Sequence, residues 1–106
     1  MIAEDGRSTS SEAMAWNARL QELPWASVLQ TWQWGELKSA FGWQAVRLNR
    51  PSGMVQVLLR PTPLGPLAYI PLGPAAASPD RLGELLAEVH KLCHSRRAFV
   101  LKVEPN

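Results

Sequence analysis

Three side chains stand where they could take part in chemistry: Lys38, Tyr69 and Glu104. The ammonium group of Lys38 is a flexible partner for phosphate oxygens. Glu104 follows an apolar run, and side chains at the end of a core strand in an open α/β sheet commonly meet ligands. A carboxylate there can orient an ammonium group, and it accepts a proton efficiently where its surroundings raise its pKa. Each residue also has a plain structural interpretation, as a solvated lysine, a packing aromatic and a surface glutamate.

The remaining reactive residues do not form a set. His90 and His94 are four residues apart on a predicted helix, a spacing that can chelate a metal, but no third ligand stands nearby in the sequence. Cys93 is the only cysteine, so an internal disulfide is excluded and we expect a buried thiol. The sequence therefore predicts no metal site.

Composition limits the kind of protein that carries these residues. The 106 residues are 46% hydrophobic, which is enough for one modest core. The net charge is only +2 and the basic residues are spread along the chain, so no DNA-binding surface is predicted. Neither a signal peptide nor the ~18 continuous apolar residues of a membrane span are found, which favours a cytoplasmic protein.

The first part of the chain predicts helices. Residues 1–12 are small, polar and charged, a composition typical of a mobile tail. A helix over residues 13–23 would end before Pro24, because the residue before a proline is pushed out of the α region. A second helix over residues 32–41 has Thr31 as its predicted N-cap.

The helix over residues 32–41 has an apolar face formed by Trp34, Leu37 and Phe41. Trp32 points to the opposite side and needs another packing partner, and the tryptophans in general are interpreted as packing residues. We expect the apolar face to share one core with a later helix. That later face is formed by Leu85, Leu86 and Val89.

Short extended runs predict a sheet. Residues 43–50 and 53–60 are joined by Pro51-Ser52-Gly53, which is typical of a hairpin turn with glycine at its left-handed position. Residues 67–70 lie in a stretch with five prolines, so we expect a short strand near a sheet edge or an opening. Residues 98–104 alternate in polarity and predict a last strand.

A helix connects the last two predicted strands. Ser78 is expected to cap it, Pro79 to occupy its first position, and its apolar residues recur at helical spacing as far as Cys93. Because a helical crossover joins them, residues 67–70 and 98–104 should form parallel strands. The order of elements predicts an α/β (α+β) domain with a mixed sheet and flanking helices.

Three local patterns coincide, in order and spacing, with one protein family. Gln30, Trp34, Lys38, Gly42 and Trp43 form the pattern Q-x3-W-x3-K-x3-GW, residues 69–74 read YIPLGP, and residues 101–105 read LKVEP. In these patterns the chain resembles the opening part of FemABX proteins, which consist of a pair of GNAT-like (acyl-CoA N-acyltransferase-like) domains. On this resemblance, residues 13–106 are the N-terminal part of the first GNAT-like domain, and we expect an incomplete fragment.

The resemblance implies an aminoacyltransferase of peptidoglycan synthesis. The acceptor would be a peptidoglycan precursor, either UDP-MurNAc-peptide or lipid II, the donor an aminoacyl-tRNA, and no metal or bound cofactor would be needed. Glu104 matches the family's carboxylate near the acceptor amine and would be catalytic. Lys38 matches a lysine that contacts the precursor's diphosphate, and Tyr69 and Phe99 would be substrate-binding.

The chain also departs from the family pattern. Leu72 stands where the family often has a basic residue, Ala77 where many members have an aspartate, and Phe99 where a substrate-binding tyrosine is similar in position. We therefore expect its detailed substrate contacts to differ.

Two other functions stay open from the sequence. A CoA-dependent GNAT acetyltransferase would need a Gly-rich R/Q-x-x-G-x-G/A turn before a helix, which the chain lacks. The other is a noncatalytic module that binds a precursor or pairs with another chain. An uncovered sheet edge would also make a fragment poorly stable or lead it to self-associate.

Overall fold

A computed structural model describes residues 2–24 and 26–104, with side chains from Ser11 onward. Trp25, predicted to be a packing residue, and Pro105, the last residue of the LKVEP motif, lie outside the described residues. The helices are α1 (Ile2–Glu22), α2 (Trp32–Ser39) and α3 (Leu82–Ser95), with short 3-10 helices η1 (Val28–Gln30) and η2 (Pro79–Arg81). The strands are β1 (Gln44–Arg50), β2 (Gly53–Arg60), β3 (Leu67–Ile70), β4 (Ala75–Ala76) and β5 (Val100–Val103).

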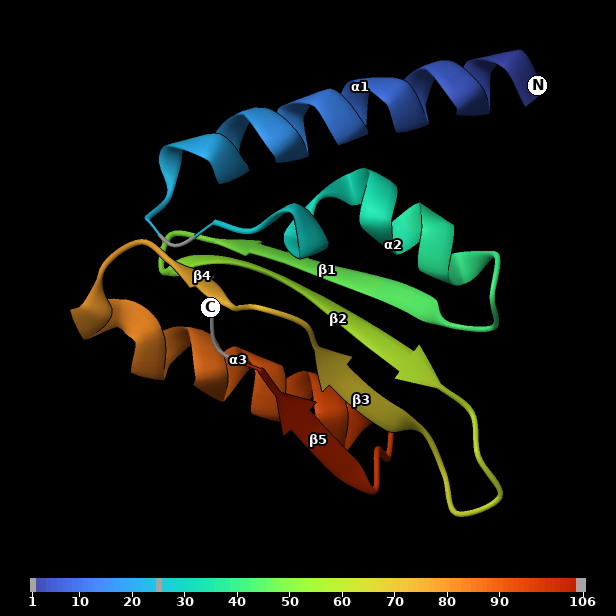
Figure 1. The fold of residues 1–106 in the computed structure, drawn as a ribbon, viewed down its shortest axis with the longest axis vertical. Helices are drawn as coiled ribbons and strands as arrows, with labels where there is room; N and C mark the ends of the chain where they lie inside the picture. The colour runs from blue at the N-terminus through green and yellow to red at the C-terminus, as the bar shows by residue number, and fades with distance from the viewer. Residues whose placement is uncertain (1, 25, 105–106) are drawn as a thin grey trace.

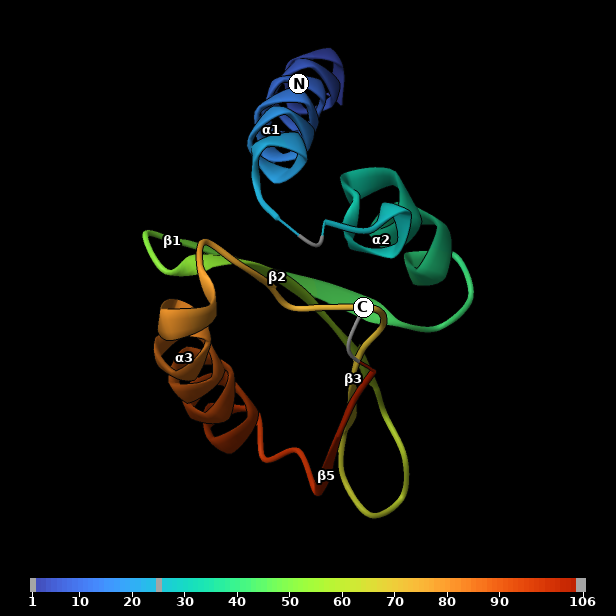
Figure 2. The same ribbon diagram turned by 60° about the vertical axis from the view of Figure 1, so that its left-hand side comes forward.

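The strands form one mixed sheet with helices on both faces. Its order is β1-β2-β3-β5, and β4 pairs with β2. Figures 1 and 2 show α1 and α2 on one side of the sheet and α3 on the other. The predicted mixed sheet with flanking helices is therefore confirmed.

The predicted hairpin is confirmed. β1 and β2 pair antiparallel from Gln44 opposite Leu59 to Arg50 opposite Gly53. Gly53 has a φ of +144°, and a Cβ there would lie 2.3 Å from the Ala75 carbonyl oxygen, so the turn requires glycine twice over.

The parallel pairing of the last two strands is also confirmed, since β3 and β5 run parallel with Tyr69 opposite Lys102. We expected β3 near a sheet edge or an opening. It is not itself an edge strand, since it lies between β2 and β5, but it is next to β5, which ends the described sheet order. Pro66 and Pro71 flank this strand and do not interrupt it, so every residue of β3 keeps its backbone N–H for the sheet.

Helix α1 is longer than predicted. It begins at Ile2 instead of residue 13, and the residues before position 13 include no proline that would stop it. Ala13, Trp16 and Leu20 are buried at helical spacing, which gives the predicted part of the helix its packing face. The mobility predicted for residues 1–12 stays a prediction.

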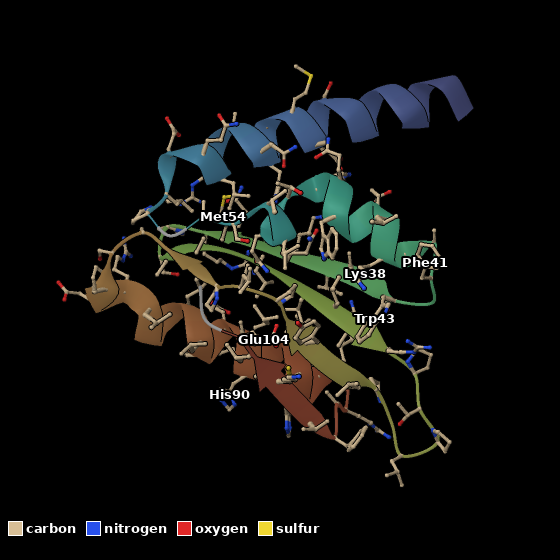
Figure 3. The ribbon with its side chains drawn as sticks, viewed as in Figure 1. Lys38, Phe41, Trp43, Met54, His90 and Glu104 are labelled. Atoms are coloured by element: carbon tan, nitrogen blue, oxygen red, sulfur yellow. The ribbon has the colours of Figure 1, made fainter. Side chains whose placement is uncertain are left out.

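The single shared core predicted for the two later helices is wrong. One buried cluster lies under α3 and includes Leu85 and Val89, and a second lies under α1 and includes Met54 (Figure 3). Leu37 of α2 and Phe41, which lies two residues beyond the end of that helix, belong to neither cluster and are 49% and 67% exposed. The sheet separates the two clusters, so the apolar faces cannot meet.

Helix α2 docks through a glycine and polar side chains. Gly35 is its buried residue, and a Cβ at Gly35 would lie 2.2 Å from Oε1 of Gln56 on β2. Arg47 donates from Nε to that same oxygen at 2.8 Å, and its guanidinium stacks 3.6 Å from the Trp32 ring centroid. Trp32 also meets Trp16 edge-on at 6.5 Å, which supplies the packing partner that the sequence required.

The ends of the helices follow the predictions only in part. The Thr31 hydroxyl accepts from the Trp34 amide at 3.4 Å, as an N-cap should. The predicted cap at Ser78 is wrong, because its side chain makes no capping bond and η2 separates Ser78 from α3. Along α3, Leu85, Val89 and Cys93 are buried as predicted.

Candidate functional site

Tyr69 and Glu104 form a hydrogen-bonded pair at the carboxyl ends of β3 and β5. The Tyr69 phenol donates to Oε1 of Glu104, and Nζ of Lys102 lies 3.9 Å from Oε2. Ala68 and Ile70 point into the core under α3, so strand alternation places Tyr69 on the α2 side of the sheet. Two of the predicted site residues therefore meet directly.

The pair keeps the phenol protonated. Its hydrogen bond to Glu104 raises the pKa of Tyr69, and burial and the negative charge of Glu104 raise it further. Ionisation would break the bond and place a phenolate beside a carboxylate. At neutral pH Tyr69 is therefore a hydrogen-bond donor that orients Glu104.

Cationic and aromatic side chains surround the pair. The Trp43 ring packs 6.1 Å from the Tyr69 ring, with the Arg60 guanidinium 5.5 Å from the Trp43 centroid. Nζ of Lys102 lies 5.6 Å from the Tyr69 centroid. Positive charges held over aromatic faces give this part of the sheet a surface that favours anions.

Lys38 adjoins the same surface. Nζ of Lys38 lies 5.4 Å from the Trp34 ring centroid, in the last turn of α2. Its carbonyl accepts from the Trp43 amide at 3.2 Å, so contacts run from Lys38 through Trp43 and Tyr69 to Glu104. Figure 3 labels Lys38 on α2, Trp43 just before β1 and Glu104 just after β5.

Sequence reasoning missed Trp43, Arg60 and Lys102 as neighbours of the pair. From the sequence, Trp43 is interpreted as a packing residue within its motif, Arg60 belongs to no motif, and Lys102 lies inside the LKVEP motif but is given no role there. The signal that could have found Lys102 is the parallel pairing, since aligning the ends of the two strands places it opposite Tyr69.

Phe99 is not brought to these residues. It precedes β5 and so lies at the opposite end of that strand from Glu104. It lines a separate pocket of about 260 Å³ with Cys93 and both histidines of α3. Its substrate-binding role stays a prediction.

The reactive residues of α3 form no metal site. Cys93 is buried, as predicted, and burial raises the pKa of its thiol, which favours the unreactive form. His90 and His94 are exposed, and Figure 3 shows His90 pointing away from the sheet. Within residues 2–24 and 26–104, no three His, Cys, Asp or Glu side chains gather to hold a metal ion.

Comparison with solved structures supports the family resemblance. The crystal structure titled FemX superimposes with a TM-score of 0.76 and 25% sequence identity, covering 88% of this chain. The resemblance to the FemABX family is confirmed. The GNAT-like fold expected from that resemblance is confirmed with it. This FemABX-like chain spans only 25% of the length of the FemX chain.

Other comparisons add nothing to this identification, since no family model and no curated protein matches the sequence. Among the helices of the described residues, none is both long enough and apolar enough to cross a membrane.

Proposed function

We propose that the protein carrying this chain transfers an amino acid from aminoacyl-tRNA to an amine of a peptidoglycan precursor. In this proposal the chain supplies part of the site that receives the precursor. The observation that carries it is the Tyr69–Glu104 pair, which stands at the strand end where the family motif puts its acceptor-side carboxylate. The FemX-like fold supports the same assignment.

The chemistry follows from the activated donor. The neutral amine of the stem peptide or bridge attacks the ester carbonyl, a C–N bond forms, and the C–O bond to the tRNA ribose breaks. Glu104 takes the proton that the amine gives up and returns it to the departing ribose oxygen, so no proton is gained or lost overall. Since the ester is already activated, the site has chiefly to align the amine and stabilise developing charge.

Lys38 is assigned to the precursor's diphosphate, which UDP-linked and lipid-linked precursors share. The cations around the Trp43 and Tyr69 rings support an anionic ligand on this side of the sheet. Because charged tRNA is a cytoplasmic substrate, the proposal carries with it a cytoplasmic location.

Kinetics of the protein that carries the chain, with precursor and charged tRNA varied separately, test the proposal. Glu104→Gln should lower kcat by roughly 10²–10⁴-fold with little change in precursor binding, because it removes the proton acceptor and nearly preserves shape. Glu84→Gln is the control, since Glu84 is an exposed residue of α3 that pairs with Arg81. Wild-type turnover in Glu104→Gln would remove Glu104 from catalysis. Precursor binding without any transfer would instead identify a noncatalytic binding module.

A further inference from the structure

Strand β2 changes partners along its length and leaves a gap between them. β3 pairs with residues 58–60 and β4 with residues 53–54. In the gap, the backbone amide of Gln56 donates to Oε1 of Gln30 at 2.7 Å, and the backbone carbonyl of Gln56 accepts from Nε2 of Gln30 at 3.4 Å. A carboxamide has the donor and acceptor of a peptide group, so the Gln30 side chain takes the place of a strand residue.

The same side chain holds the turn that follows β3. Nε2 of Gln30 also donates to the Pro71 carbonyl at 2.8 Å, and the side chain is fully buried. Gly73 permits this fit, since a Cβ there would lie 2.8 Å from Cδ of Gln30. The backbone carbonyl of Gln30 accepts a hydrogen bond from Nε1 of Trp16 at 2.9 Å.

This turn fixes the backbone of Glu104. The Gly73 amide donates to the Glu104 carbonyl at 3.0 Å, and the Glu104 amide donates to the Ile70 carbonyl at 3.0 Å. Glu104 follows the last residue of β5, so these bonds set where its side chain starts. The carboxylate then receives the Tyr69 phenol.

We propose that Gln30 is a positioning residue for Glu104, acting through the turn over residues 71–74. The Gln30 side chain fixes the position of the turn, and the turn fixes the backbone of Glu104. That backbone position directs the Glu104 carboxylate toward the Tyr69 phenol. The catalytic consequence rests on the proposed function, whereas the geometry can be measured without it.

Tyr69 reports on that geometry because it is the chain's single tyrosine. Ultraviolet titration of tyrosinate in the 106-residue chain follows its pKa, which the bond to Glu104 raises. Glu104→Gln should bring this pKa down toward that of a free tyrosine. Gln30→Met keeps size and burial but removes the amide, and it should lower the pKa in the same direction. Gln21→Met, at an exposed site on α1, should leave it unchanged.

Unfolding would also free the phenol, so each variant is first checked for native tryptophan fluorescence. If Gln30→Met does not fold, Gly73→Ala replaces it, because the added Cβ displaces the turn while both hydrogen-bonding amides of the gap stay in the chain. A wild-type Tyr69 pKa in a folded variant would overturn the proposal.

A double-mutant cycle tests the catalytic consequence. Gln30→Met should lower kcat at least tenfold in the wild-type background and less than twofold in the Glu104→Gln background, with the KM for precursor unchanged in both. Equal losses in both backgrounds would mean that Gln30 supports the fold and does not act through Glu104. If Glu104→Gln leaves kcat unchanged while Gln30→Met lowers the Tyr69 pKa, the proposed function fails and the positioning role stands.

Discussion

The two glycines of α2 and α3 should respond oppositely to the same substitution. Alanine is the better helix former, by about 1 kcal/mol in a helix interior. At Gly83, in the first turn of α3, a Cβ would meet nothing within 4 Å. Gly83→Ala should therefore stabilise the fold by up to about 1 kcal/mol.

At Gly35 the contacts outweigh the propensity. A Cβ would lie 2.2 Å from Oε1 of Gln56 and 2.6 Å from Nη2 of Arg47. Neither atom moves freely. The Gln56 side chain is fully buried and donates to the Thr31 carbonyl at 2.9 Å, and Nη2 of Arg47 donates to the Trp32 carbonyl at 3.0 Å. Losing the charged bond between Arg47 and Gln56 costs about 1.5–3 kcal/mol, and overpacking adds about 1–3 kcal/mol. After the helix-propensity gain, Gly35→Ala should lower the free energy of unfolding by about 1.5–5 kcal/mol.

Urea unfolding followed by tryptophan fluorescence measures both variants, at several protein concentrations to separate folding from association. The signs should differ between the two positions. A Gly35→Ala chain as stable as wild type would refute the polar docking of α2, and destabilisation by Gly83→Ala would show that helix propensity is not the governing term there.

Four further outcomes are expected. Lys38→Ala should weaken binding of a diphosphate-bearing precursor by about 1–3 kcal/mol in calorimetry, while Lys91→Ala, which removes the same charge from an exposed α3 site, should not; equal affinities would take Lys38 out of the site. Leu85→Ala should cost about 2–5 kcal/mol of unfolding free energy because Leu85 is fully buried, and a loss below about 1 kcal/mol would contradict that core. Since folding raises the pKa of Tyr69, its bond to Glu104 stabilises the fold at neutral pH and this contribution falls as the pH rises above about 10; Tyr69→Phe should abolish that part of the pH dependence of unfolding. Sedimentation should show self-association, which Val100→Lys reduces, because β5 ends the described sheet order and its Val100 is exposed; a concentration-independent monomer would count against it.

Several elements could be predicted from the sequence because their signals are local. The hairpin of β1 and β2 is specified by a proline-serine-glycine turn between alternating runs, and the α3 face by apolar residues three and four apart. The parallel pairing of β3 and β5 follows from the helical crossover between them. Lys38, Tyr69 and Glu104 were found as candidates because each belongs to a short recognisable pattern.

Only the tertiary structure decided how these patterns act together. The contacts that matter join residues far apart in the chain: Gln30 bonds to Gln56 and Pro71, at separations of 26 and 41 residues, and Tyr69 bonds to Glu104 across 35. Helical periodicity gave the wrong contact face for α2, since Leu37 and Phe41 are exposed and Trp34 is half-buried, while Gly35 meets a buried polar network. Hydrophobic periodicity indicates only which side chains avoid water. A buried glutamine is stable only where the folded backbone supplies its hydrogen-bond partners, and no local pattern in the sequence predicts those partners.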